Sequence, residues 1–345
     1  MTIAAAADPD TIAPRAEAAL RQSWSGAEVS TVATLPGGAS SLTYVAELTE
    51  GTAPADRVVV KMAPPGLEPV RNRDVLRQAR VLDLLSADSD VAVPSVLGTD
   101  RGEPPGVPPL FVMTMVEGES FEPTNGPGDP PPFDIVEARA LSAARMLARL
   151  HAVDPLAPAL EGERTYQLSD EVNRWSKAFA TVEGDLRPDT VDRCRDELLS
   201  SAPEAQPAAV LHGDWRLGNM LCQGPAINAV IDWEIWSLAD PRIDLAWFLL
   251  MADTSRSPGL RSGTGLPDPE RLAAVYEQER GVPLEAIDWF SALVRYKQAA
   301  ASALIVKNNR KSSDPDPRAL SFAGIIAPLL DGALGYLRRA EGQIP

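Results

Sequence analysis

Residues 211–244 contain the feature that most constrains this chain, a series of short apolar runs that alternate with polar side chains. The apolar pairs are residues 210–211, 220–221 and 230–231. The polar positions include Asp214, Asn219 and Asp232. A turn containing Gly224 and Pro225 separates the second pair from the third, which predicts a short hairpin. We expect this hairpin to anchor the polar groups at a cleft.

The types and spacing of these three polar residues suit phosphoryl transfer. That reaction needs a group that orients the nucleophilic hydroxyl and accepts its proton, and it needs hard oxygen ligands for magnesium. A carboxylate at Asp214 can serve the hydroxyl, while Asn219 and Asp232 offer a neutral and an anionic oxygen to the metal. The spacing is like the Asp-x-x-x-x-Asn catalytic loop of protein kinases, which a metal-binding aspartate follows further along the chain.

The first third of the chain favours β-structure. Residues 58–60 form its clearest β-branched run, and residues 91–97 and 110–116 are typical of two more strands. Two helices are expected among these strands, a short amphipathic one within 10–24 and one at about 71–85 with an apolar inner face.

Helical spacing dominates beyond a Pro- and Gly-rich segment at 121–132. The first apolar residues to recur at this spacing are Ala140, Ala144, Leu147 and Leu150. We therefore expect an α+β protein of two lobes with a cleft between them. Residues 1–118 would form the small β-rich lobe, and residues 119–345 the larger helical lobe with the catalytic loop.

Charge and composition argue against several kinds of partner. A net charge of −16 and a sequence pI of about 4.6 disfavour binding to nucleic acid or to anionic membranes. The acidity suits solubility, and an acidic groove for a cationic substrate is the alternative. Two cysteines provide no disulfide framework and no N-terminal signal is recognised, so a cytoplasmic location is expected. The apolar residues 322–337 are expected to be too short and too interrupted to span a membrane.

Three motifs carry a family resemblance. They are His212-Gly-Asp-x-x-x-x-Asn219, Ile231-Asp-Trp-Glu234 and Asp240-Pro-x-x-Asp-Leu-Ala246. Together they resemble the aminoglycoside phosphotransferase and choline kinase superfamily, and most closely the kinase-like domains associated with acyl-CoA dehydrogenases. Segments near Lys61, Met115 and His151 add support, and the likeness extends roughly from residue 30 to residue 340.

This resemblance implies a protein-kinase-like fold and gives each polar residue a role. Asp214 would be the catalytic base, while Asn219 and Asp232 would hold Mg²⁺. Lys61, at the end of the β-branched run, would contact the phosphates of ATP, since an ammonium group can bridge phosphate oxygens.

The resemblance also implies which segments bind the nucleotide. A turn of small residues would cover the phosphates with its backbone amides; it includes Gly37, Gly38, Ser40 and Ser41. The segment that would meet the adenine edge is Thr114, Met115 and Val116. Two departures stand out. Gln78 takes the place of the usual helix glutamate, with Asp74 as an alternative partner for the lysine, and the phosphate turn lacks a regular G-x-G-x-x-G.

Several neighbouring residues are expected to support the loop. Asp244 would brace it from the start of a helix, and His212 would brace it by hydrogen bonding of its ring. His151 is expected to pack between elements. The tryptophans near the motif, Trp215, Trp233, Trp236 and Trp247, would serve mainly as core residues, with one or two available to line an acceptor pocket.

The sequence therefore predicts an enzyme that transfers phosphate from Mg-ATP to a hydroxyl of a small metabolite, with a hydroxy-acid or hydroxyacyl compound suggested by the resemblance. One alternative is an aminoglycoside phosphotransferase. Another is a regulatory protein that binds nucleotide without catalysis, which the glutamine at position 78 would favour. A monomer or a homodimer is expected.

Overall fold

The computed structural model describes residues 9–35, 41–124, 126, 128–255, 260–340 and 342. The chain folds into two compact units. Unit 1 comprises Met1–Ser120, Leu156–Gly162 and Asn219–Trp236. Unit 2 comprises Phe121–Pro155, Glu163–Gly218 and Ser237–Pro345. The first segment of unit 1 ends at Ser120, close to the predicted lobe boundary at residue 118. The segment Asn219–Trp236 belongs to unit 1, whereas the sequence predicted it as part of the helical lobe.

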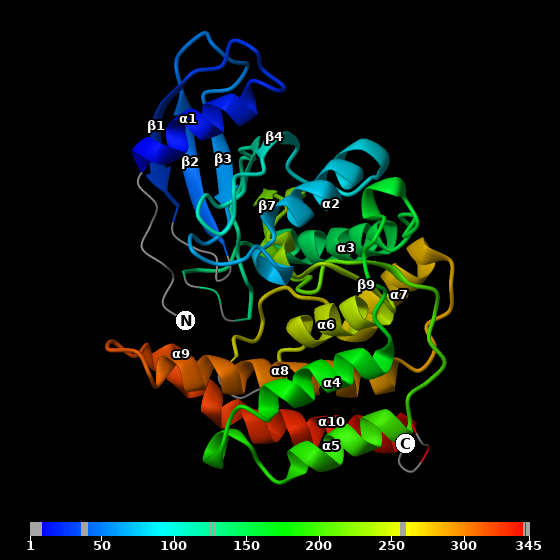
Figure 1. The fold of residues 1–345 in the computed structure, drawn as a ribbon. Coiled ribbons are helices and arrows are strands. Elements are labelled where there is room, and N and C mark those ends of the chain that lie inside the picture. Colours follow the sequence, from blue (N-terminus) through cyan, green and yellow to red (C-terminus); the bar gives the residue numbers. More distant parts are fainter. Residues whose placement is uncertain are drawn as a thin grey trace. The chain divides into compact units, whose positions relative to one another are not determined.

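Unit 1 is built on a five-stranded antiparallel sheet with the order β1-β2-β3-β5-β4 (Figure 1). The strands are β1 (Val29–Thr34), β2 (Leu42–Leu48), β3 (Arg57–Met62), β4 (Val96–Asp100) and β5 (Leu110–Thr114). The prediction of a strand from residue 91 is wrong at its start, because β4 begins only at Val96. Pro94 has no N–H to donate to a strand ladder, which disfavours pairing of the residues before Val96.

One face of this sheet packs against α1 (Pro9–Leu20). Side chains alternate between the two faces of a strand, so every second residue of the central strands points to α1. Tyr44, Val60 and Val112 are fully buried there together with Ile12 and Leu20 of the helix. This cluster is the hydrophobic core of unit 1, and it leaves the intervening side chains to face the other side.

The opposite face carries a row of residues in register across three strands. Thr43 on β2 lies opposite Lys61 on β3, and Lys61 lies opposite Phe111 on β5. The neighbouring pair is Val59 with Met113. Because these positions alternate with the core residues, the same pattern that builds the α1 face also brings the lysine to the other face.

The helix α2 (Val75–Asp88) contacts β4 and β5. It carries the expected apolar face, on which Val75, Leu82 and Leu85 are buried. The helix begins at Val75 rather than at residue 71, because Asp74 is its N-cap and accepts a hydrogen bond from Arg77 N at 3.0 Å. Residues 71–73 form a separate 3-10 turn, η1 (Arg71–Arg73).

The predicted hairpin is present and consists of β7 (Met220–Gln223) and β8 (Ala226–Val230). Gly224 in its turn has a φ of 53°, a left-handed conformation that glycine adopts without strain. Backbone hydrogen bonds attach both strands of the hairpin to the rest of unit 1. Glu119 and Cys222 exchange backbone hydrogen bonds of 2.9 Å, and Val230 N donates to the carbonyl of Ala92 at 2.8 Å.

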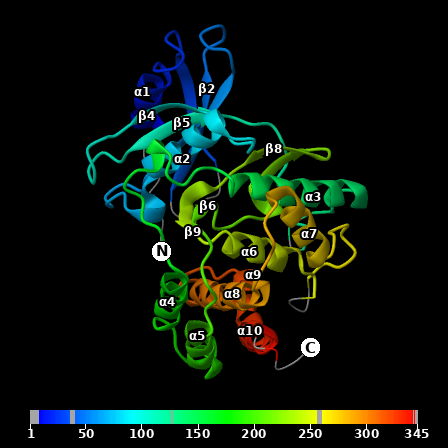
Figure 2. The same cartoon turned by 90° about the vertical axis from the view of Figure 1, so that its right-hand side faces the viewer.

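Unit 2 is predominantly helical (Figures 1 and 2). Its helices include α3 (Phe133–Leu150), α4 (Leu168–Phe179), α5 (Thr190–Ser200), α6 (Arg242–Ala252), α7 (Pro269–Arg280), α8 (Ile287–Asn309), α9 (Pro317–Ser321) and α10 (Ile326–Ala340). The short strands β6 (Ala209–Leu211) and β9 (Ser237–Ala239) pair antiparallel. A sheet-based unit and a helical unit together confirm the predicted α+β class.

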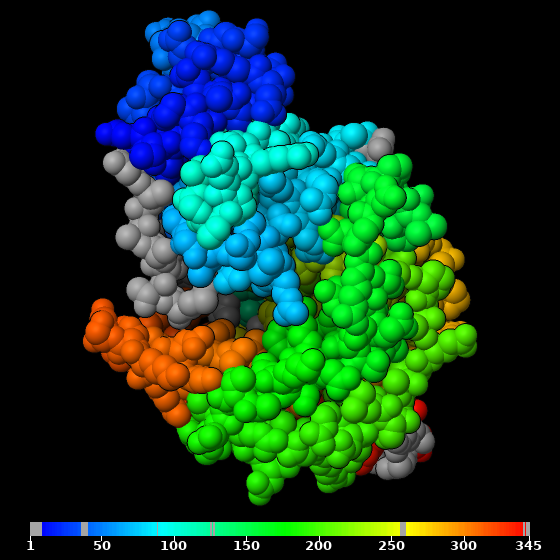
Figure 3. All heavy atoms as spheres, in the orientation of Figure 1, coloured from blue at the N-terminus to red at the C-terminus, as the bar shows by residue number. Residues whose placement is uncertain are grey.

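The helix α8 organises the core of unit 2. It contacts α4, α5, α6 and α10, and its buried residues include Phe290, Tyr296, Ala300 and Val306. On the face drawn in Figure 3, side chains of the green segments hide most of α8 from view. A helix with apolar residues around most of its circumference is expected where neighbours surround it in this way.

The C-terminal helical stretch Pro317–Ala340 is long and apolar enough to cross a bilayer by length and composition. The expectation that it is too short is therefore wrong. One face of its main part, α10, is buried in the core of unit 2, through Ile326, Leu330 and Leu334 among others. This burial accounts for the apolar residues of that face as core residues.

Candidate active site

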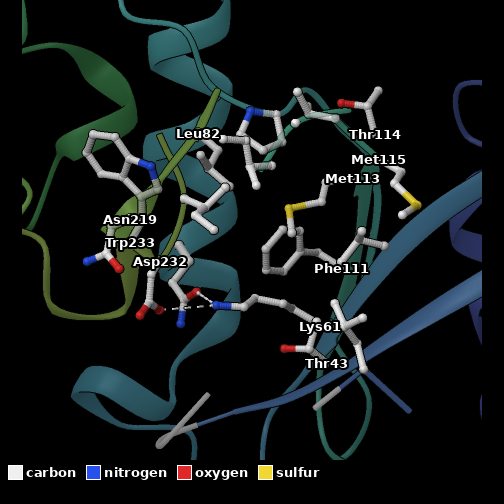
Figure 4. Close-up of a pocket in the computed structure, with 18 residues that line it drawn as sticks. Thr43, Lys61, Leu82, Phe111, Met113, Thr114, Met115, Asn219, Asp232 and Trp233 are labelled. Carbon is white, nitrogen blue, oxygen red and sulfur yellow. Dashed lines mark hydrogen bonds and ion pairs between the residues drawn. The ribbon is translucent and has the colours of Figure 1, made fainter. Parts of the chain in front are cut away.

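A cavity of about 350 Å³ lies within unit 1, lined by the sheet, α2 and the β7–β8 hairpin (Figure 4). Its apolar walls include Val59, Leu82, Phe111, Met113, Leu221 and Ile231. Polar side chains that reach the same space include Lys61, Gln78, Asn219 and Asp232. Mostly apolar walls with a few converging polar groups are typical of a small-molecule site.

Lys61 is the cation of this cavity and is only 9% exposed. Its Nζ lies 3.4 Å from Gln78 Oε1 and 3.6 Å from Asp232 Oδ1 (Figure 4). Gln78 therefore lies beside the lysine, and its Nε2 donates to the carbonyl of Asn72 at 3.4 Å. The alternative partner, Asp74, is engaged as the N-cap of α2. The lysine thus has one neutral neighbour and one anionic neighbour.

Asp232 and Asn219 bring oxygen-bearing side chains to the cavity from the two ends of the hairpin. Ile231 N donates to the Asn219 carbonyl at 2.9 Å, which holds these ends together. Asp232 has a φ of 69°, a left-handed conformation that Asp tolerates better than most residues. Among the described residues, no cluster of three or more His, Cys, Asp or Glu is placed to hold a metal. One carboxylate and one amide still fit Mg²⁺, which commonly takes one or two protein oxygens together with phosphates and water.

The segment predicted to meet adenine also borders the cavity. Thr114, Met115 and Val116 line it, and Thr114 Oγ1 accepts a hydrogen bond from Ser95 N at 3.0 Å. Gly37, Gly38 and Ser40 of the predicted phosphate turn lie outside the described residues. Ser41 is described: its side-chain hydroxyl is buried and has no hydrogen-bond partner among the described residues.

In unit 2, one buried carboxylate holds the loop that follows β6. Asp244, in the first turn of α6, accepts hydrogen bonds from His212 N at 2.6 Å and from Gly213 N at 2.9 Å. The ring of His212 also supports the loop, because its Nδ1 accepts from Asp214 N at 3.1 Å. Both residues contact the loop as the sequence predicts.

Asp244 also lies beside His151, at the end of α3. His151 Nε2 is 3.8 Å from Asp244 Oδ2, too long for a hydrogen bond, and its Nδ1 is 2.7 Å from the hydroxyl of Tyr276 on α7. Burial lowers the pKa of His151, which favours a neutral ring. Burial alone would raise the pKa of Asp244, but nearby basic groups, Lys297 among them, hold it below its ordinary value.

Asp214 itself is fixed through both carboxylate oxygens. Oδ1 accepts from the indole Nε1 of Trp247 at 2.8 Å, and Oδ2 accepts from Arg216 Nε at 3.1 Å. The side chain is 25% exposed, so the group is reachable. Burial would raise its pKa, but Arg216, Lys297 and His212 more than offset this, and the pKa lies below its ordinary value. The group is therefore an anion at neutral pH.

Three of the residues around Asp214 were not singled out from the sequence. Arg216 reaches from Asp214 to Glu122, whose Oε2 is 3.4 Å from Arg216 Nη1 and 3.4 Å from Gly218 N. Lys297 comes from α8, more than eighty residues after the loop, and donates to the carbonyl of Gly213. Of these three residues, only Arg216 lies inside the motif 212–219. Its position two residues after Asp214 could have identified it as a neighbour of that carboxylate.

The tryptophans divide between two roles. Trp215, Trp233 and Trp236 are almost fully buried, which agrees with the expected packing role. Trp233 also lines the cavity of unit 1. Trp247 is 8% exposed and is the one that hydrogen-bonds to Asp214.

The sequence matches a known family and known proteins. The model of the phosphotransferase enzyme family matches residues 31–280. The rat protein named acyl-CoA dehydrogenase family member 11 is 24% identical over 267 residues, which cover 73% of this chain and 32% of that protein. The chain thus spans about a third of the length of this curated relative.

Solved structures show the same fold. A candidate aminoglycoside phosphotransferase of Ralstonia eutropha superposes with a TM-score of 0.75 at 23% identity, and the match covers 96% of this chain and 99% of that one. A spectinomycin phosphotransferase, solved with ADP and spectinomycin, gives a TM-score of 0.63 at 11% identity with the same coverage. At these identities the likeness establishes the fold.

Proposed function

Because the chain belongs to the phosphotransferase enzyme family, we propose that it transfers the γ-phosphoryl group of Mg-ATP to a hydroxyl of a small metabolite. The observation that carries the proposal is the group of Lys61, Asn219 and Asp232 at one cavity of unit 1. A cation beside two oxygen donors is the combination that a metal-bound polyphosphate requires.

The nucleotide would occupy the cavity of unit 1. Lys61 would bind phosphate oxygens, and its present partners, Gln78 and Asp232, hold it extended toward that space. Asn219 and Asp232 would hold the magnesium ion, which neutralises phosphate charge when bound. The spectinomycin phosphotransferase of the same fold was solved with ADP, which supports a nucleotide as the ligand.

Asp214 would act on the acceptor. Its carboxylate would accept the proton of the hydroxyl while that oxygen forms its bond to the γ-phosphorus and the bond from phosphorus to the bridging oxygen of ADP breaks. Trp247 and Arg216 each hold one carboxylate oxygen, so the group is already oriented. A pKa below the ordinary value keeps it deprotonated and ready to accept a hydrogen bond at neutral pH.

Charges of both signs surround Asp214. Arg216 and Lys297 act on it as cations, while Glu122 lies 3.4 Å from Arg216 and the buried Asp244 acts on Lys297. These carboxylates offset the two cations, so the acceptor class is proposed from the relatives instead. The name of the rat relative, which refers to an acyl-CoA dehydrogenase, points to acyl compounds such as a hydroxy-acid or a hydroxyacyl-CoA.

The test is phosphate transfer to a panel of hydroxy-acids, hydroxyacyl-CoAs and aminoglycosides, with ATP and GTP as donors. We expect transfer from ATP to members of the first two classes. Transfer to aminoglycosides alone would support antibiotic inactivation instead. Failure on the whole panel, together with slow ATP turnover, would support the regulatory alternative.

A substitution separates catalysis from binding in the same assay. Asp214→Ala should lower transfer by about 10²–10⁴-fold, which is the usual contribution of acid–base catalysis. Thermal stabilisation by Mg-ATP should persist, because the cavity of unit 1 keeps all its residues. Asp331→Asn, an exposed position on α10, is the matched control and should transfer as the unaltered protein does. Full activity of Asp214→Ala would refute the assigned role.

A further inference from the structure

Lys297 is a buried ammonium with no assigned role in the proposed reaction. The side chain is 7% exposed and lies on α8, where its Nζ donates to the carbonyl of Gly213 at 2.6 Å. The same Nζ lies 4.2 Å from the ring centroid of Trp247. Taking an ammonium out of water is costly unless its new partners compensate, so a buried lysine here calls for a function or a strong structural reason.

We propose that Lys297 is a positioning residue for Asp214, holding the loop on one side and Trp247 on the other. Gly213 immediately precedes Asp214, so the bond to its carbonyl fixes the peptide unit that carries Asp214. Trp247 donates to Asp214 Oδ1, so the contact of Lys297 with the ring supports the group that orients the carboxylate. One ammonium thereby supports both the backbone and the side chain of Asp214. The inference rests on the proposed role of Asp214 as the acceptor-activating group.

Backbone geometry makes the first contact specific. Gly213 has a φ of 88°, a left-handed conformation that directs its carbonyl in a way few other residues allow. Its N–H is held by Asp244 and its carbonyl by Lys297. The N–H of Gly213 is thus paired to a buried anion and its carbonyl to a buried cation. These two contacts leave the backbone of the loop little freedom to rotate at Gly213.

The second consequence is electrostatic. Burial lowers the pKa of Lys297, and three carboxylates oppose this: Asp214 on the loop, Asp244 on α6 and Glu171 on α4; Arg174 on α4 adds to the lowering. Asp214 in turn faces Arg216 and His212 in addition to Lys297. A cation near a carboxylate favours its charged form, so removing Lys297 should make the Asp214 carboxylate easier to protonate.

The indole of Trp247 offers a direct probe that needs neither nucleotide nor acceptor. Its Nε1–H is hydrogen-bonded to Asp214, so its ¹⁵N–¹H resonance should change when that carboxylate is protonated. The protein would be labelled with ¹⁵N-tryptophan, the Trp247 resonance identified by its loss in Trp247→Phe, and the shift followed against pH. We expect the midpoint in Lys297→Met to lie about one pH unit above that of the unaltered protein.

A matched control comes from the same helix. Lys307 also donates to a backbone carbonyl, that of Thr181 at 2.6 Å, but it is not among the charged groups that act on Asp214. Lys307→Met should leave the midpoint unchanged. Lys297→Arg keeps the charge, so its midpoint should lie close to that of the unaltered protein. An equal midpoint in Lys297→Met and the unaltered protein would overturn the proposal.

Transfer kinetics supply the second readout, and they distinguish failure of this inference from failure of the proposed function. With a working acceptor, Lys297→Met should lower kcat by about tenfold to a hundredfold with less effect on KM, since misplacing a reacting group by about 1 Å has that cost. If no acceptor is found, the proposed function fails while the titration still decides the role of Lys297.

Should Lys297→Met not fold, Trp247→Phe tests the same arrangement. Phenylalanine keeps an aromatic ring beside Lys297, although a smaller one, and removes the indole donor. The titration would then be read from the carboxyl ¹³C resonance of Asp214, and loss of a hydrogen bond to the charged form should raise its midpoint. An unchanged midpoint in this variant would contradict the proposed link from Lys297 through Trp247 to Asp214.

Discussion

Replacement of Asp244 by alanine should be among the most destabilising single changes in unit 2. The carboxylate is fully buried and accepts hydrogen bonds from two backbone N–H groups, those of His212 and Gly213. Alanine leaves both donors buried without an acceptor. At roughly 1–3 kcal/mol for each buried unsatisfied group, the loss is about 2–6 kcal/mol. For a domain of this size that corresponds to a fall in Tm of about 4–24 °C.

Asp244→Asn and a pH series test the same two hydrogen bonds. Asp244→Asn keeps one acceptor oxygen, so it should lose about half as much as alanine. The pKa of Asp244 is lower in the folded protein than its ordinary value of 3.8, so its charge stabilises the fold above that value. This contribution is lost as the pH falls through the folded pKa. The difference between the unaltered protein and Asp244→Ala should therefore be constant from pH 6 to pH 8 and shrink only below about pH 4.

The measurement is urea unfolding followed by tryptophan fluorescence, with thermal unfolding as a second method. Asp331→Asn on α10 removes an exposed carboxylate and should change the free energy of unfolding by less than about 0.5 kcal/mol. If Asp244→Ala matched this control, the two N–H groups would have to find other acceptors, and the argument from buried donors would be refuted.

Two further changes test the packing and the backbone of unit 1. Gly98→Ala should lower the free energy of unfolding, measured by thermal unfolding, by about 1–3 kcal/mol, because a Cβ there would overlap the backbone carbonyl of Ala19 at the end of α1. Gly324→Ala is the control, since its Cβ would meet nothing within 4 Å. Equal stability of the two variants would disprove the close approach at Gly98. Asp232→Ala should be about 1 kcal/mol less stable than Asp232→Asn, because asparagine tolerates the left-handed backbone and alanine does not. Both Asp232 variants should lose magnesium-dependent stabilisation by ATP, and retention of it in either would contradict the proposed ligand role.

Local sequence patterns were sufficient for the hairpin and for the sheet face. The apolar pairs at 220–221 and 230–231 with a glycine turn between them specify β7 and β8, because each signal lies within a few residues of the next. The placement of Lys61 at the end of a β-branched run likewise follows from strand alternation.

Other parts of the site depend on contacts between distant segments, which no local pattern records. Lys297 and Gly213 are 84 residues apart, and Arg216 and Glu122 are 94 apart. A lysine in a long helix is usually solvated, so its sequence context gives no reason to expect a buried ammonium. The start of α2 was misplaced for a different reason, since Asp74 was considered as a partner of Lys61 and is in fact the helix cap.

The grouping of Asn219–Trp236 with unit 1 has a consequence for biosynthesis. The β-sheet of unit 1 is complete in the nascent chain by residue 114, but the hairpin that lines its cavity and bonds to Glu119 and Ala92 is made more than a hundred residues later. At a synthesis rate of about 5–20 residues per second, the interval from residue 114 to residue 236 is roughly 6–24 s. During that time the apolar cavity wall around Phe111 and Met113 lacks its cover, so we expect the growing chain to be most prone to chaperone binding and aggregation before residue 236 emerges.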